Sequence, residues 1–367
     1  MTDKEVFFEE NGSLGLIKLN RPKALNALTL SMVRAIHPQM IKWEKSKSIK
    51  SVAIIAEGEK AFCAGGDIRA LHDWGKNNDK KATGFYEEEY ILNQYIKRYP
   101  KPYISFVNGI VMGGGVGLSV HGSHRIAGEN YSFAMPETGI GLFPDVGGTY
   151  FLSRLKHNAG VYLALTGSRI KAQDAIFLGT ANHFVHSKNF NDIIKALSQS
   201  DDVDSIIKQF EADPGKSDFE EISALCNKVF AGDSIEKIIS NLIKENSDLS
   251  KKFLSTIHTK SPTAIKIALK SLRLGSKLNF EECMKMEFRM VNRVMRDHDF
   301  YEGVRALIID KDNKPNWSPE KINDVKDDFV NEFFNSLDNN ELIFNSEVIM
   351  VNINSSGNYI EHYSYVH

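Results

Sequence analysis

Three consecutive glycines, Gly113 to Gly115, constrain this chain more than any other stretch of its sequence. They follow a short apolar run and open a predicted helix whose first N–H groups no side chain would cover. Two carboxylates, Glu137 and Asp145, come from a later loop. Exposed amides can hold an oxygen that gains negative charge, and carboxylates can move protons or attack carbon. The segment therefore predicts an acyl-transfer site.

Each part of this prediction has a simpler explanation as well. Glycines also serve tight turns and close packing. An oxyanion site needs two converging N–H donors, and the candidates are the amides of Gly114 and Gly66. An exposed or capping carboxylate would explain either acid alone, and Asp145 in particular could cap a helix. The apolar residues around Glu137 favour the functional interpretation, because they would desolvate its carboxylate and raise its pKa.

Apolar runs alternate with helical patterns through the first half of the chain. Residues 14–19, 51–58 and 102–108 have the character of strands, and residues 31–43 and 84–98 carry apolar side chains at helical spacing. This alternation predicts an α/β fold with most helices outside the sheet and with functional residues in loops that follow strands.

The second half of the chain is mostly helical by the same criteria. Ser261 and Pro262 suit the cap and first position of one helix, and a methionine-rich helix passes through Cys283. We expect its methionines to pack in the core. The chain is divided into a core that carries the site (1–186), a helical insertion (187–255), a C-terminal helical region (256–325) and an unassigned tail (326–367).

Composition excludes several classes of function. A net charge of −2 gives no basic field for nucleic acid, and no apolar stretch has the length of a membrane span. The three cysteines lie far apart, which predicts a reducing compartment, no disulfide framework and no metal site. His121 and His298 show no metal-binding spacing, so we expect core or surface roles for them. The expected location is the cytoplasm, or the mitochondrial matrix if a presequence has been removed.

Five motifs together resemble the crotonase superfamily, whose fold is a ClpP-like spiral of repeated ββα units. They are NRPKALNAL from Asn20, AFCAGGDI from Ala61, MGGGVGL from Met112, MPETGIGLFPDVGGT from Met135 and LTGSRIKAQDA from Leu165. The resemblance covers residues 5–320. The later HDFYEGVRALIIDKD segment is typical of the branch that hydrolyses 3-hydroxyisobutyryl-CoA. The resemblance implies an α/β core of the superfamily type with additional helices in the C-terminal half.

The resemblance implies a role for each candidate catalytic residue. The amides of Gly66 and Gly114 would hold the oxyanion. Glu137 would be the catalytic glutamate, which attacks the thioester or activates water. Asp145 would be its partner acid, which hydrogen-bonds the 3-hydroxyl group of the substrate or assists water. Glu89 would border the acyl pocket.

The resemblance also implies where coenzyme A would lie. One segment would contribute Lys23, Ala24 and Leu25, and a second would contribute Ala64, Asp67 and Ile68. The side chain of Lys23 or Arg69 could meet a phosphate of the coenzyme. Coenzyme A enters as part of the substrate, so no separate cofactor is implied.

The sequence departs from the hydratases of the superfamily at two acidic positions, which bears on whether the reaction is hydration or hydrolysis. Hydratases of this fold use two glutamates around a water molecule, and the first would fall at Gly117, whereas Asp145 stands where they carry glycine. This exchange argues against ordinary hydration. The resemblance implies thioester hydrolysis of 3-hydroxyisobutyryl-CoA and similar short 3-hydroxyacyl-CoAs, in valine catabolism. An enoyl-CoA hydratase or isomerase, and a non-catalytic CoA-binding protein, are the alternatives. The expected partner is a small acyl-CoA, and assembly into a homo-oligomer stays open.

Overall fold

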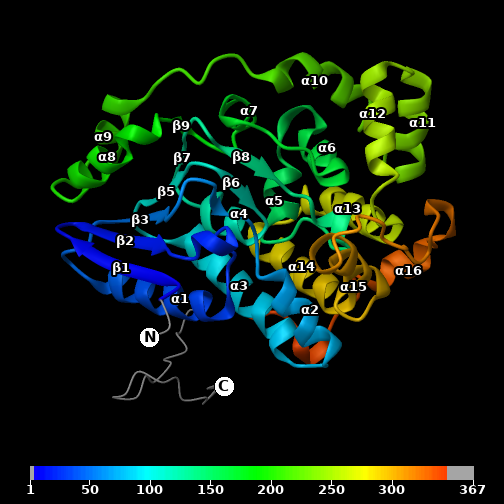
Figure 1. Ribbon diagram of the computed structural model, residues 1–367, viewed down its shortest axis with the longest axis horizontal. Coiled ribbons are helices and arrows are strands. Elements are labelled where there is room, and N and C mark those ends of the chain that lie inside the picture. Colours follow the sequence, from blue (N-terminus) through cyan, green and yellow to red (C-terminus); the bar gives the residue numbers. More distant parts are fainter. Residues whose placement is uncertain (1–3, 345–367) are drawn as a thin grey trace.

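The computed structural model describes residues 4–344, in which two sheets are surrounded by helices (Figure 1). The larger sheet has the strand order β1-β2-β3-β5-β7-β9. Its first pair is antiparallel and its other pairs are parallel. The smaller sheet has the order β4-β6-β8 and is parallel. Both sheets with their helices give the α/β class that the sequence predicts.

The strands are β1 (Val6–Asn11), β2 (Leu14–Leu19), β3 (Ser51–Ala56), β4 (Ala61–Cys63), β5 (Tyr103–Val107), β6 (Ile110–Met112), β7 (His124–Ala127), β8 (Ser132–Ala134) and β9 (His183–Phe184). The helices are α1 (Leu30–Lys45), α2 (Ile68–Lys76), α3 (Lys81–Arg98), α4 (Gly114–Ser119), α5 (Gly148–Leu152), α6 (Ala159–Thr166), α7 (Ala172–Leu178), α8 (Phe190–Leu197), α9 (Val203–Phe210), α10 (Asp218–Val229), α11 (Ile235–Glu245), α12 (Asp248–Ile257), α13 (Pro262–Gly275), α14 (Phe280–Val294), α15 (His298–Val304) and α16 (Asp327–Glu332).

Three consecutive strand pairs repeat one pattern. In β3–β4, β5–β6 and β7–β8, the first strand joins the larger sheet, the second joins the smaller one, and a helix or helical turn follows. The turn between β5 and β6 needs glycine at position 109. Its φ is +111°, and a side chain there would lie 2.8 Å from the carbonyl oxygen of Lys60. The repeated ββα unit of the superfamily is thereby confirmed.

The larger sheet is covered on both faces, which explains the continuous apolar composition of its inner strands β2, β3 and β5. One face packs against α1, whose side chains Met32, Ile36 and Met40 are buried. The other face packs against α8 and α9 through buried residues such as Ile193 and Ile207. These two helices belong to the predicted insertion, and they close a second apolar core behind the sheet.

The rest of the C-terminal half packs away from that second core. Helices α11 and α12 lie at the opposite end of the molecule from α8 and α9 (Figure 1). As predicted, Ser261 caps α13, with its Oγ accepting a hydrogen bond from the N–H of Ala264 at 3.0 Å. The predicted tail contains helix α16, and its residues 345–367 lie outside the described part. The proposed domain boundaries stay predictions. Between residues 4 and 344, no helix is both long and apolar enough to cross a membrane.

Gly15 offers a test of packing between β2 and α1. A side-chain carbon at Gly15 would lie 2.6 Å from the indole ring of Trp43, which is fully buried. We expect Gly15→Ala to lower the free energy of unfolding by about 1–3 kcal/mol, because the ring has no room to move. Urea unfolding measures this.

The matched control is Gly84→Ala in α3, where a side-chain carbon meets nothing within 4 Å. Alanine should leave stability unchanged there or raise it by up to about 1 kcal/mol. If Gly15→Ala were as stable as the unaltered protein, the packing described for β2 and α1 would be wrong.

Candidate active site

The smaller sheet brings the predicted catalytic residues together. Gly66 follows β4, Gly114 follows β6, and Glu137 follows β8. These three strands are parallel neighbours, so their carboxyl ends lie at one edge of the sheet. Residues that are far apart in the sequence therefore meet in one place.

The amides of Gly66 and Gly114 are available as hydrogen-bond donors. A side-chain carbon placed on Gly114 would lie 3.4 Å from the backbone nitrogen of Gly66, so the two residues are neighbours. Within residues 4–344, neither N–H donates to another group. Two such amides side by side can hold an oxygen that becomes negative, as an oxyanion hole requires.

Four carboxylates are buried around these glycines. Glu89 of α3, Glu137 and Asp145 are each at most 5% exposed, and Glu287 of α14 is fully buried. The hydroxyl of Tyr90 donates a hydrogen bond of 2.8 Å to Oδ2 of Asp145. Helix α5 is instead preceded by Gly147 as its capping residue. The exposed and capping explanations for these acids therefore do not hold.

Burial keeps these acids protonated to unusually high pH. It raises the pKa of Asp145 to about 7 and that of Glu287 to about 8. Burial, followed by the charge of Asp145, raises the pKa of both Glu89 and Glu137 well above the ordinary carboxyl value. In the described part of the chain, no salt bridge joins any of the four to a cation. The site can therefore exchange protons near neutral pH.

Sequence reasoning missed Glu287, which fixes the loop that carries Asp145. Its carboxylate accepts hydrogen bonds from the N–H of Gly147 at 2.7 Å and from the N–H and hydroxyl of Thr149 at 2.9 and 2.5 Å. A signal was present, because Glu287 interrupts the apolar stripe of α14 that includes Cys283 and Val294. A carboxylate at a core position of a helix needs partners.

The same loop contains a strained residue. Val146 has a φ of +51°, a backbone conformation that β-branched side chains rarely adopt. Its carbonyl oxygen pairs with Nε2 of buried His121 at 2.7 Å, and burial lowers the pKa of that imidazole to about 3. The neutral ring then donates from Nε2. Of the core and surface roles that the sequence leaves open for His121, the structure shows the core role.

The two segments predicted to bind coenzyme A run side by side. The N–H of Ala64 donates to the carbonyl of Leu25 at 3.0 Å. Lys23, Ala24 and Arg69 are exposed, and Ile68 begins α2. Asp67 serves the fold, because its carboxylate caps α2 and pairs with Arg21 at 3.0 Å.

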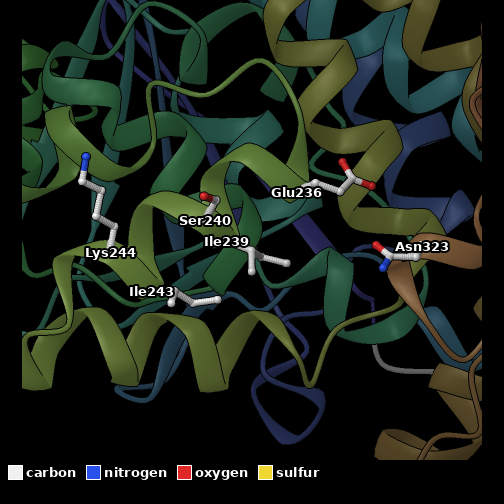
Figure 2. Close-up of a pocket in the computed structure, with 6 residues that line it drawn as sticks. All are labelled: Glu236, Ile239, Ser240, Ile243, Lys244 and Asn323. Carbon is white, nitrogen blue, oxygen red and sulfur yellow. The ribbon is translucent and has the colours of Figure 1, made fainter.

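Other features lie apart from this site. A cavity of about 450 Å³ is lined by five residues of α11 and by Asn323, with none of the predicted site residues (Figure 2). All three cysteines are buried and free. In the described ranges, no group of His, Cys, Asp and Glu is arranged to hold a metal ion.

Comparison with known proteins places the chain in a family. Residues 14–334 match the family described as enoyl-CoA hydratase/isomerase. The chain belongs to this family, and the expected superfamily is confirmed.

Two curated relatives share a narrower name. A Danio rerio protein named 3-hydroxyisobutyryl-CoA hydrolase, mitochondrial, is 47% identical over 348 residues, which cover 92% of this chain and 91% of the relative. The human protein of the same name is 44% identical over 351 residues, covering 93% and 91%.

Solved structures support the same fold. A carnitinyl-CoA dehydratase from Mycobacterium thermoresistibile matches with a TM-score of 0.90 and 36% identity, over 94% of this chain and all of that one. An enoyl-CoA hydratase from Rhodobacter sphaeroides matches with a TM-score of 0.88 and 36% identity, over 93% and 100%.

The raised pKa values of Asp145 and Glu287 predict that the protein loses stability as the pH rises. Folded Asp145 and Glu287 keep their protons up to about pH 7 and about pH 8, whereas an unfolded chain loses them near about pH 4. The folded state therefore binds more protons across this window, and the free energy of unfolding falls as the pH rises through it. Urea unfolding at about pH 5 and about pH 9 measures the difference.

The variant Asp145→Asn, Glu287→Gln tests the assignment. Neither replacement titrates, so the decline of stability with pH should be smaller than in the unaltered protein. A decline of the same size would show that other groups cause it.

Tyr90→Phe should raise the pKa of Asp145. The hydroxyl of Tyr90 stabilises the ionised carboxylate, and phenylalanine keeps the ring while removing that bond. A carbon-13 NMR titration of the carboxyl groups, with Asp145→Asn for assignment, measures the shift.

Tyr95→Phe is the matched control, because Tyr95 lies on the same helix and bonds Glu44 instead. It should leave the titration of Asp145 unchanged. Equal titration of Asp145 in Tyr90→Phe and in the unaltered protein would contradict the described contact.

Proposed function

We propose that this protein hydrolyses the thioester of 3-hydroxyisobutyryl-CoA and of similar short 3-hydroxyacyl-CoAs. The observation that carries the proposal is the buried carboxylate of Glu137, whose Oε2 has no partner within residues 4–344, beside the free amides of Gly66 and Gly114. The names of the curated relatives support the same substrate.

The residues divide the reaction between them. The amides of Gly66 and Gly114 receive the thioester oxygen as it becomes negative. Glu137 acts from its ionised form, either by attacking the carbonyl carbon to give a mixed anhydride or by taking a proton from water that attacks. The carbon–sulfur bond breaks, the sulfur of coenzyme A takes up a proton, and water supplies the new oxygen of the acid. Asp145, with a pKa of about 7, assists these proton transfers.

The geometry around Gly117 argues against hydration of an alkene. A side-chain carbon at this position would lie 2.6 Å from Nδ2 of Asn93. A side chain can therefore take the place of the first hydratase glutamate only if the Asn93 amide and its surroundings move. The two solved structures with 36% identity carry hydratase or dehydratase names, so an enoyl-CoA is a necessary comparison substrate.

Three further assignments complete the proposal. Coenzyme A would lie along the segments of Leu25 and Ala64, with Lys23 or Arg69 near a phosphate. The protein would act in valine catabolism in the mitochondrial matrix, as the location in the relatives' names suggests. Coenzyme A would enter only as part of the substrate.

Thiol release from 3-hydroxyisobutyryl-CoA, followed with a colorimetric thiol reagent, tests the function. We expect release from this thioester and from 3-hydroxypropionyl-CoA, and no hydration of crotonyl-CoA. Glu137→Gln should lower turnover at least about 100-fold, because the amide can neither attack nor take a proton.

The control is Glu221→Gln, an exposed glutamate that pairs only with Lys216 among the described residues. It should keep full turnover. Loss of the crotonyl-CoA absorbance without thiol release would instead identify a hydratase, and near-normal turnover in Glu137→Gln would remove Glu137 from the chemistry.

A further inference from the structure

Polar side chains of helix α3 line one face of helix α4. On that face α4 itself has glycines, which carry no side chains. A side-chain carbon on Gly114 would lie 2.5 Å from Oε1 of Glu89, and one on Gly117 would lie 2.6 Å from Nδ2 of Asn93. Glu89 and Asn93 are four residues apart on α3, so they are neighbours on one face of that helix. Two polar groups of α3 thus reach the backbone of α4, one helical turn apart.

Asn93 has no partner for either end of its amide. It is fully buried, and both Nδ2 and Oδ1 lack a hydrogen bond to any residue in the described range. Oε1 of Glu89 and the hydroxyl of buried Tyr86 lack one too. An unpaired buried amide is costly, and such groups in proteins normally find a partner. This row of unpaired groups therefore has hydrogen-bonding capacity for a bound molecule.

The chemistry of the row indicates a hydroxyl group. The Asn93 amide offers both a donor and an acceptor, and a hydroxyl group can satisfy one while it pairs with a neighbouring acid. The amide of Gly114 faces the thioester oxygen in the proposed function, and Gly117 lies one turn further along α4. Neighbouring positions on a helix face are about 5–6 Å apart. A substituent on the second carbon beyond the carbonyl would fall opposite Asn93.

We propose that Asn93 recognises the 3-hydroxyl group of the acyl chain and is the residue that makes the enzyme select 3-hydroxyacyl thioesters. This inference rests on the proposed function. It adds a specificity-determining residue on α3, separate from the acids that carry the chemistry. A substrate without the hydroxyl group would leave the Asn93 amide unpaired, which a site of this kind penalises strongly.

The test compares 3-hydroxyisobutyryl-CoA with isobutyryl-CoA, which differs only in lacking the hydroxyl group. Asn93→Leu keeps the approximate shape of the side chain and removes its polar atoms. We expect kcat/KM for the hydroxylated substrate to fall about 100-fold or more, while that for isobutyryl-CoA changes less than about threefold or rises. An equal fall for both substrates would overturn the proposal, because it would indicate a water-binding or purely structural role.

A second measurement tests the proposal even if Asn93→Leu folds poorly or the enzyme shows no turnover. In the Glu137→Gln background, calorimetry gives the Kd of each thioester with Asn93 and with Asn93→Ala, which is smaller and adds no bulk. The preference for the hydroxylated ligand should be lost in Asn93→Ala, and a retained preference would overturn the proposal. If the unaltered protein released no thiol from either substrate, the proposed function would fail, and the ratio of the two Kd values would still decide the role of Asn93.

Discussion

The close approach of helices α3 and α4 is the constraint on which the site depends. Glu89 and Asn93 occupy the space that a side chain at position 114 or 117 would need, so glycine suits both positions. With no side chains between them, polar groups of α3 reach the backbone of α4, and the amide of Gly114 stays open to a ligand. The open amide of Gly114 and the lack of room for a side chain at position 117 are therefore consequences of one helix contact.

This arrangement buries several carboxylates, which lowers the stability of the folded protein but places their pKa values nearer neutral pH. Burial raises the pKa of all four carboxylates, with no opposing cation among the described residues. Two of them are held by neutral donors instead: the hydroxyl of Tyr90 donates to Asp145, and the N–H groups of Gly147 and Thr149 donate to Glu287. Neutral donors fix position without removing the raised pKa, which is what an acid or base near neutral pH needs.

Local signals made much of the fold predictable. The apolar runs of β2, β3 and β5 and the Ser261 cap of α13 depend on neighbouring residues alone, and the structure has them where the sequence indicates. The smaller sheet was not predictable, because its strands are three residues long and carry no period. Glu137 and Asp145 were found through their motif. Glu287 and Asn93 were missed because each lies within an apolar helical stripe, where only tertiary contacts reveal its role.

The hydrogen bonds of Glu287 have a consequence for how the protein is made. They join α14 to Gly147 and Thr149, across 140 and 138 residues of sequence. Synthesis proceeds from the N-terminus, so the ββα repeats leave the ribosome well before the helix that secures the strained loop. During that interval the newly made chain has the glycines and Glu137 but no fixed Asp145. The loop that carries Asp145 is thus secured late in the synthesis of the polypeptide, when α14 arrives.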